Sequence, residues 1–269
     1  MIQHEMIVPD TLPYEIKSFL GTVYELAYPR QGDTSDVAIV VCERGKYVVK
    51  RSRGGQFRDW LAQEYHVLQA LIEVSLPLPR PYLYVECCTS ETPEAWLVMS
   101  HLPGDSLRIV ACNEADQAAK RQMLFAVGQV LAKLHSLAVP TALCAERGKA
   151  WLDSMLKQAR YNLEHYEVEG SAELLEQLET QRPRMVQPTL IHGDFAIDNV
   201  LIVDREVSGI VDWAWGAWGD PRYDRALAIR PKEGIFQMPE DTQSFFNGYG
   251  TAGLSQDEYD YFVSLYEFF

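Results

Sequence analysis

The chain contains 269 residues, of which 47% are hydrophobic and 23% are charged, so it can bury a sizeable core and is neither disordered nor of low complexity. Its 24 basic and 38 acidic residues give a formal net charge of −14, which disfavours nucleic acid and anionic membranes as partners. No signal peptide opens the sequence and no apolar run is long enough to span a membrane, so we expect a cytoplasmic protein. The five cysteines contain no CxxC pair, which predicts neither a disulfide framework nor a thiolate zinc site.

The first hundred residues have the pattern of a small antiparallel sheet with one helix. Apolar residues recur at helical spacing between about Phe57 and Val74, which predicts a helix there. Turn residues separate the strand-like runs and predict a meander at the start of the sheet. The strands are expected at 22–26, 37–42, 47–50, 82–86 and 95–99.

The pattern changes after 101–104, and helices dominate the rest of the chain. A long helix is expected to start at Asn113, with Asp116 completing a capping pair. We therefore predict an α+β fold, with a mainly β domain over 1–100, a hinge at about 100–104 and a mainly α domain over 101–269. Further helices are expected at 149–166, 171–179, 222–230, 240–246 and 255–269, and short strands at 199–203 and 207–211.

The segment from Leu190 to Trp213 carries the strongest functional signal. Asp194 stands in a loop between apolar runs, where its carboxylate can orient a substrate hydroxyl and accept the proton. Asn199 follows in the same loop and Asp212 follows the next strands, and both offer the oxygen ligands that Mg²⁺ prefers. Each residue alone could be a turn former or a helix cap, but the spaced set favours phosphoryl transfer.

Lys50 and Glu64 add a second signal in the N-terminal part. Lys50 ends a predicted strand and Glu64 lies on the helix that follows. A strand lysine paired with a helical glutamate can hold nucleotide phosphates, although a solvent-exposed lysine and glutamate are the alternative interpretation. In the presence of Asp194, Asn199 and Asp212, we favour the phosphate role.

Together these motifs resemble those of the aminoglycoside phosphotransferase family, within the wider choline-kinase-like and protein-kinase-like fold. The resemblance covers nearly the whole chain and includes Leu134-His135, Met99-Ser100 and the run from Gly219 to Asp224. It implies a bilobal protein-kinase-like fold, in which a small antiparallel β-sheet N-lobe with one helix precedes a larger, mainly α C-lobe. It also implies a phosphotransferase that uses ATP or GTP with Mg²⁺ to phosphorylate an alcohol group of a small molecule.

The resemblance assigns roles to particular residues. It implies that Asp194 is the catalytic base, that Asn199 and Asp212 are metal ligands, and that Lys50 with Glu64 holds the phosphates. A loop over 30–36 would cover the phosphates, although a plain hairpin turn is the alternative. The backbone of Ser100 and Leu102 would meet the nucleobase. The implied nucleotide contacts, besides Lys50 and Glu64, are Thr34, Ser35, Val48, Met99, Ser100, Leu102, Leu201 and Val211.

The acceptor is less defined. The resemblance is closest to the branch that phosphorylates the 3′-hydroxyl of aminoglycosides, although Tyr266 stands where that branch usually has an aspartate. The acidic surface favours a cationic acceptor, so we expect an aminoglycoside-like or other amino-bearing antibiotic. The alternatives are a metabolic kinase for choline, homoserine or a sugar, and a nucleotide-binding pseudokinase. We expect a monomer or a homodimer. The implied acceptor contacts are Asp198, Asp220, Arg230, Glu267 and Phe269.

Two other features are interpreted as structural. The run from Gly248 to Gly253 satisfies GxGxxG, but no strand precedes it, so a helix-ending turn is expected there. The interval between Asp212 and Pro221 is too short for the activation segment with which a protein kinase docks a peptide, which favours a small acceptor.

Overall fold

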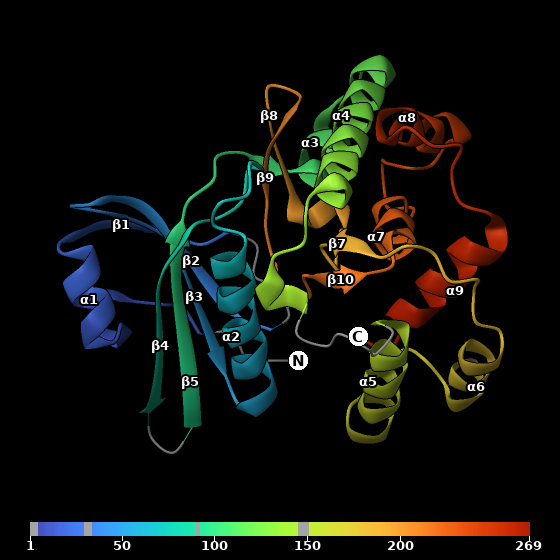
Figure 1. Cartoon of the computed structure of the whole chain (residues 1–269). Coiled ribbons are helices and arrows are strands. Elements are labelled where there is room, and N and C mark those ends of the chain that lie inside the picture. The colour runs from blue at the N-terminus through green and yellow to red at the C-terminus, as the bar shows by residue number, and fades with distance from the viewer. Residues whose placement is uncertain (1–4, 30–33, 90–91, 145–150) are drawn as a thin grey trace. The chain divides into compact units, whose positions relative to one another are not determined.

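The computed structural model describes residues 5–29, 34–89, 92–144 and 151–269 (Figure 1). The contacts divide the chain into two compact units. Unit 1 contains Met1–Pro103 and Val211–Trp215, and unit 2 contains Gly104–Ile210 and Gly216–Phe269. The short segment Val211–Trp215 therefore packs with residues that lie far earlier in the chain.

Among the described residues, unit 1 is built on a five-stranded antiparallel sheet with the order β1-β2-β3-β5-β4. The first three strands form the predicted meander, and β5 pairs with both β3 and β4. The short 3-10 helix η1 (Pro9–Thr11) and helix α1 (Tyr14–Leu20), which precede the sheet, were not predicted. The strands are β1 (Val23–Ala27), β2 (Asp36–Cys42), β3 (Gly45–Arg53), β4 (Pro81–Thr89) and β5 (Thr92–Ser100).

The two faces of this sheet pack against different helices, because side chains alternate along each strand. Val49 of β3 points into a buried apolar cluster that α1 covers. Lys50, the next residue, points to the opposite face and meets Glu64 of α2 (Gly55–Ala70), which lies along the strands in Figure 1. The alternation of β3 therefore decides that the lysine faces α2. The cluster under α1 includes Ile16, Leu20, Val40, Val49, Trp96 and Val98.

Unit 2 is mainly helical, with short strands that position its loops. Strand β8 (Val200–Val203) pairs with β6 (Asp105–Ser106) and β9 (Glu206–Ile210), and β7 (Thr189–Ile191) pairs with β10 (Ala217–Gly219). In the described part of the chain, no helix is long and apolar enough to cross a membrane. The helices are α3 (Leu107–Asn113), α4 (Gln117–Ser136), η2 (Thr141–Cys144), α5 (Trp151–His165), α6 (Ala172–Thr180), η3 (Ile197–Asn199), α7 (Pro221–Ala228), α8 (Pro239–Tyr249) and α9 (Gln256–Tyr266).

The helix expected to start at Asn113 was placed wrongly. Asn113 is the last residue of α3, which was not predicted, and Asp116 is the N-cap of α4. The Asp116 carboxylate accepts the amide N–H of Ala118 at 2.9 Å. The first turn of a helix leaves its amide groups without partners, and Asp116 satisfies one of them. The chain therefore turns between the two helices, and the cap forms three residues later than expected.

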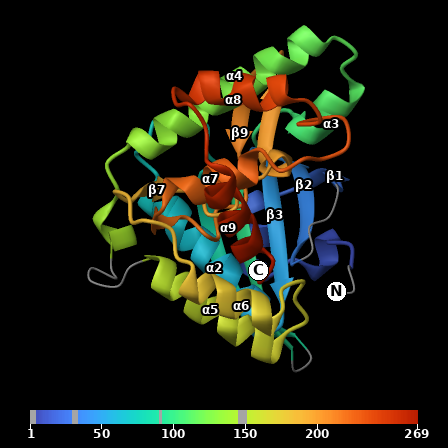
Figure 2. The ribbon, with the colours of Figure 1, turned by 90° about the vertical axis from the view of Figure 1, so that its right-hand side faces the viewer.

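Helices α4 and α8 lie side by side in both ribbon views (Figures 1 and 2). A Cβ atom at Gly248 would lie 2.0 Å from the carbonyl oxygen of Phe125, and one at Gly128 would lie 2.1 Å from that of Phe245. Glycine at both positions therefore lets the two helix backbones approach. The run that starts at Gly248 thus serves helix packing first, and Gly250 then ends α8 with a left-handed φ of 88°.

Candidate active site

The first cluster of charged side chains lies in unit 1, where Lys50 of β3 meets Glu64 of α2. Lys50 is 7% exposed, and its Nζ donates hydrogen bonds to both carboxylate oxygens of Glu64, at 2.8 and 2.9 Å. A buried ammonium group is costly unless it is paired, and Glu64 pairs it. The strand and the helix therefore bring together the two residues that the sequence suggested as a pair.

Asp212 joins this cluster from the segment Val211–Trp215. Its backbone has a left-handed φ of 65°, and its carboxylate accepts a hydrogen bond from Lys50 Nζ. The backbone N–H of Trp213 donates to Glu64. Burial alone would lower the pKa of Lys50, but the carboxylates of Asp212 and Glu64 raise that pKa above its ordinary value. Lys50 therefore carries its charge throughout the physiological pH range.

Two residues suggested for the nucleobase share the face of Lys50. Val48 lies two positions before Lys50 on β3 and is paired with Met99 of β5, which is buried. Ser100 ends β5, where its N–H donates to the carbonyl oxygen of Arg80 at 2.9 Å and its Oγ accepts the N–H of Arg80 at 2.8 Å. The N–H of Ser100 is therefore already used within unit 1. Leu102 follows and is half-buried.

The loop expected over the phosphates lies partly outside the described residues, which omit 30–33. At its end, the carbonyl oxygen of Thr34 accepts the Ser52 hydroxyl at 3.3 Å, and Ser35 is buried. Asp36, the last residue of the expected loop, instead opens β2. Its carboxylate accepts a hydrogen bond from Arg51 at 2.7 Å, which neutralises its charge.

The second cluster lies in unit 2, in the loop that follows β7. Asn199 donates through Nδ2 to the carbonyl oxygen and to Oδ2 of Asp194, at 2.9 Å each. The N–H of Asp194 donates to Nδ1 of the buried His192 at 3.2 Å. These bonds hold the Asp194 carboxylate in one orientation. Because Asp194 itself is only half-buried, a hydroxyl group can reach it.

The orientation of Asn199 suits a metal ligand. Both of its side-chain hydrogen bonds use Nδ2, which directs Oδ1 away from Asp194. In unit 1, the Asp212 side chain is 47% exposed, so its carboxylate is accessible to a cation. Amide and carboxylate oxygens are the hard ligands that Mg²⁺ requires. The donor atoms of these two residues therefore fit the metal that the sequence implied.

Asp224 of α7 fixes the backbone before Asp194, although its sequence position had not suggested it as a site residue. Its fully buried carboxylate accepts the N–H groups of His192 at 2.7 Å and Gly193 at 2.8 Å. His135 of α4 meets the same carboxylate through Nε2 at 3.2 Å, and its Nδ1 lies 2.8 Å from the Tyr249 hydroxyl. The sequence did contain a signal for Asp224 in two motifs, Leu134-His135 and Gly219 to Asp224. Each motif ends at a residue of this hydrogen-bond network.

Tyr266 of α9 is a second residue of the site that was not expected from the sequence. Its hydroxyl donates a hydrogen bond to Oδ1 of Asp194 at 3.1 Å. Burial, together with the negative charge of Asp194, raises the pKa of Tyr266 above its ordinary value. The guanidinium carbon of Arg230 lies 4.7 Å from the centre of the Tyr266 ring. Tyr266 therefore connects the expected base with Arg230, which had been suggested for the acceptor.

The other suggested acceptor residues have different surroundings. Asp198 forms an ion pair with Arg108 at 3.4 Å. Asp220 is the N-cap of α7 and pairs with Arg222 at 2.6 Å. Glu267 caps the end of α9, and Phe269 packs against the helical core of unit 2. The structure therefore brings Asp198 and Arg230 to the surroundings of Asp194 and Tyr266, whereas Asp220 stabilises a helix. Leu201 lies on β8 of unit 2, and Val211 lies in unit 1.

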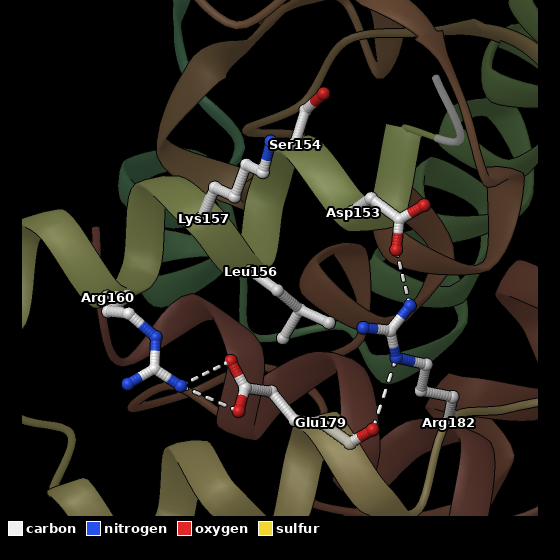
Figure 3. Close-up of a pocket in the computed structure, with 7 residues that line it drawn as sticks. All are labelled: Asp153, Ser154, Leu156, Lys157, Arg160, Glu179 and Arg182. Atoms are coloured by element: carbon white, nitrogen blue, oxygen red, sulfur yellow. Dashed lines mark hydrogen bonds and ion pairs between the residues drawn. The ribbon is translucent and has the colours of Figure 1, made fainter. Parts of the chain in front are cut away.

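A separate pocket of about 300 Å³ lies beside α5 and α6 in unit 2 (Figure 3). Two ion pairs line it: Arg160 donates to both carboxylate oxygens of Glu179 at 2.7 Å, and Arg182 pairs with Asp153. Leu156 lies between the two pairs in Figure 3. Its lining includes no residue that the sequence suggested for the site, so this pocket is not the candidate active site.

Comparison with known proteins points to one family. The sequence profile of the phosphotransferase enzyme family (APH) matches residues 28–261 of the chain. The aminoglycoside 3′-phosphotransferase of Streptomyces fradiae is 27% identical over 225 residues, which cover 78% of this chain and 80% of that protein. The homoserine kinase of Neisseria meningitidis serogroup B is 28% identical over 171 residues, which cover 61% of this chain and 56% of that protein.

A larger protein also contains a similar segment. Acyl-CoA dehydrogenase family member 11 of Pongo abelii is 27% identical over 196 residues, which cover 67% of this chain and 24% of that protein. The aligned segment is therefore about a quarter of that relative's length.

Solved structures confirm the predicted α+β, kinase-like fold. The crystal structure of an aminoglycoside 3′-phosphotransferase of type VIII matches with a TM-score of 0.74 at 23% identity, covering 95% of this chain and 97% of that chain. Other similar structures are complexes with ATP, ADP or GDP.

Proposed function

Because the chain belongs to the phosphotransferase enzyme family (APH), we propose that it is a Mg²⁺-dependent kinase that transfers the γ-phosphate of ATP or GTP to a hydroxyl group of a small molecule. The observation that carries this proposal is the pair of hydrogen bonds from Asn199 to Asp194, which present a fixed and accessible carboxylate. In this proposal, unit 1 contributes the nucleotide-binding residues other than Leu201, and unit 2 contributes Leu201, the catalytic loop and the acceptor contacts.

The proposed reaction assigns a task to each cluster. The oxygen of the acceptor attacks the γ-phosphorus, the bond from that phosphorus to the bridging β–γ oxygen breaks, and the nucleoside diphosphate leaves. Asp194 orients the acceptor hydroxyl and accepts its proton. Lys50, held by Glu64, binds the nucleotide phosphates. Mg²⁺, with oxygen ligands from Asn199 and Asp212, would neutralise the phosphate charge.

The relatives support two acceptor classes. An aminoglycoside-like antibiotic, and with it a role in resistance, is supported by the similarity to 3′-phosphotransferases. A hydroxylated amino acid is supported by the similarity to homoserine kinase. A pseudokinase is the remaining alternative. The complete set of Lys50, Glu64, Asp194, Asn199 and Asp212 favours an enzyme over it.

The test is the consumption of ATP and of GTP by the purified chain, with and without Mg²⁺, across aminoglycosides, homoserine, choline and sugars. We expect acceptor-dependent turnover that Asp194→Asn lowers by about 10²- to 10⁴-fold, because a general base contributes roughly that much. Asp204→Asn makes the same chemical change at an exposed turn with a φ of 50° and should retain activity. Nucleotide binding without any turnover that depends on Asp194 would instead support a pseudokinase.

A further inference from the structure

Two of the carboxylates suggested for a cationic acceptor, those of Asp198 and Asp220, are paired with arginines within unit 2. Asp198 is paired with Arg108 at 3.4 Å, and Asp220 is paired with the buried Arg222 at 2.6 Å. The net charge of −14 acts on a distant ligand, but salt screens it over about 8 Å. The charges within contact distance of the acceptor therefore decide which ligand is bound.

Arg230, in contrast to these carboxylates, is a positively charged residue of unit 2 whose charge is not paired with a carboxylate among the described residues. It is half-buried just beyond the end of α7, and its guanidinium carbon lies 4.7 Å from the centre of the Tyr266 ring. Among the described residues, no carboxylate lies within ion-pair distance of this guanidinium, although the chain has an excess of acidic groups. A guanidinium stacked on a ring keeps N–H groups at its edge, where a carboxylate can accept two of them.

Tyr266 places this cation next to the reacting group. Its hydroxyl donates to Asp194 Oδ1 at 3.1 Å, while its ring contacts Arg230. The acceptor hydroxyl must reach Asp194, so the rest of a small acceptor lies beside the Tyr266 ring, within reach of Arg230. Tyr266 stands where the aminoglycoside branch usually has an aspartate. The site therefore lacks one negative charge that would favour a cationic acceptor.

We propose that the acceptor is a hydroxy acid, and that Arg230, stacked on Tyr266, binds its carboxylate while Asp194 takes the hydroxyl proton. This inference rests on the proposed function and narrows its acceptor class. The reaction converts the hydroxy acid and the nucleoside triphosphate into a phosphorylated acid, a nucleoside diphosphate and a proton. The proposed role of Arg230 is the same with ATP or with GTP as the phosphate donor.

Matched acceptors test the proposal. Straight-chain hydroxy acids, diols and amino alcohols of three to six carbons share the reacting hydroxyl group, and at the other end carry a carboxylate, a neutral hydroxyl or an ammonium group. We expect kcat/KM for the best hydroxy acid to exceed that for the matching diol by about 10- to 100-fold, the usual range for hydrogen bonds to a charged group. Arg230→Gln should remove most of this ratio, and Arg230→Lys should retain part of it.

Two further variants distinguish an effect on acceptor preference from a loss of stability. Arg225→Gln is the matched control, because Arg225 of α7 likewise stacks on a tyrosine ring, that of Tyr249 at 5.3 Å, so the ratio should not change. Arg230→Glu should reverse the preference toward amino alcohols. The melting temperature of each variant shows whether it is folded.

The outcomes separate this inference from the proposed function. A preference for amino alcohols or aminoglycosides over hydroxy acids would overturn the inference and leave the phosphotransferase proposal standing. An equal loss for acids and diols in Arg230→Gln would overturn it as well, because Arg230 would then act on the nucleotide or the fold. The absence of any turnover that depends on Asp194 would overturn the proposed function, and this inference with it.

Discussion

The Asp224 carboxylate accepts the backbone N–H of Gly193 at 2.8 Å, from a position 31 residues later in the sequence. Gly193 has a φ of 82°, a left-handed conformation that glycine adopts without steric cost. Because Gly193 directly precedes Asp194, helix α7 decides where the expected base is held. The loop after β7 and helix α7 therefore form one hydrogen-bonded assembly inside unit 2.

Asp224→Asn tests this assembly. An asparagine side chain would turn an N–H group toward the backbone donors of His192 or Gly193, which leaves buried donors without acceptors. We expect the free energy of unfolding to fall by about 2–4 kcal/mol, as urea denaturation would measure. Glu206→Gln makes a similar change at an exposed position and should cost less than about 0.5 kcal/mol. Equal stability of the two variants would contradict the role of Asp224.

Lys50→Met would leave the buried Glu64 carboxylate without its ammonium partner. Removing one partner of a buried ion pair usually costs about 3–5 kcal/mol, and we expect a loss in the lower part of that range from urea denaturation. Lys50→Met combined with Glu64→Leu should recover part of the loss, because no charge then remains buried at either position. A double variant that is less stable than Lys50→Met would show that packing, rather than charge, dominates there.

Gly248→Ala should force helices α4 and α8 apart. The added Cβ would lie 2.0 Å from the carbonyl oxygen of Phe125, and backbone cannot move aside as a flexible side chain can. We expect a loss of about 1–3 kcal/mol, measured as a lower melting temperature. Gly55→Ala is the matched control, because a Cβ there meets nothing within 4 Å at the start of α2, so stability should be unchanged or higher.

Tyr261 should make the free energy of unfolding fall at alkaline pH. Burial raises the pKa of Tyr261 to about 12, and its hydroxyl donates to the carbonyl oxygen of Leu178 at 2.9 Å. The unfolded chain loses this proton near pH 10 and the folded chain near pH 12, so the free energy of unfolding falls between these values. Tyr261→Phe should make that fall shallower in denaturation experiments across this range. Tyr14→Phe, at an exposed position, should leave the slope as it is.

Much of the fold followed from local patterns. Strand-like runs separated by turn residues predicted the meander that includes β2 and β3, and helical spacing between Phe57 and Val74 predicted α2. Helix ends were harder to predict from the sequence, because a cap depends on where the chain turns. Asn113 ends α3, and the cap of α4 is Asp116. The residues of α1 lacked a strong local signal, and the helix is stabilised by its packing on the sheet.

The sequence by itself determined the α+β fold and the residue types that suggested phosphoryl transfer, because strand-like runs between turn residues, helical spacing and short motifs are local properties. It could not determine the partners of those residues. Tyr266 meets Asp194 across 72 residues, and Lys50 meets Asp212 across 162. Such contacts depend on how elements pack, which local periodicity does not encode. Only the tertiary structure placed Tyr266 between Asp194 and Arg230, because that arrangement requires α7, α9 and the loop after β7 to fold together.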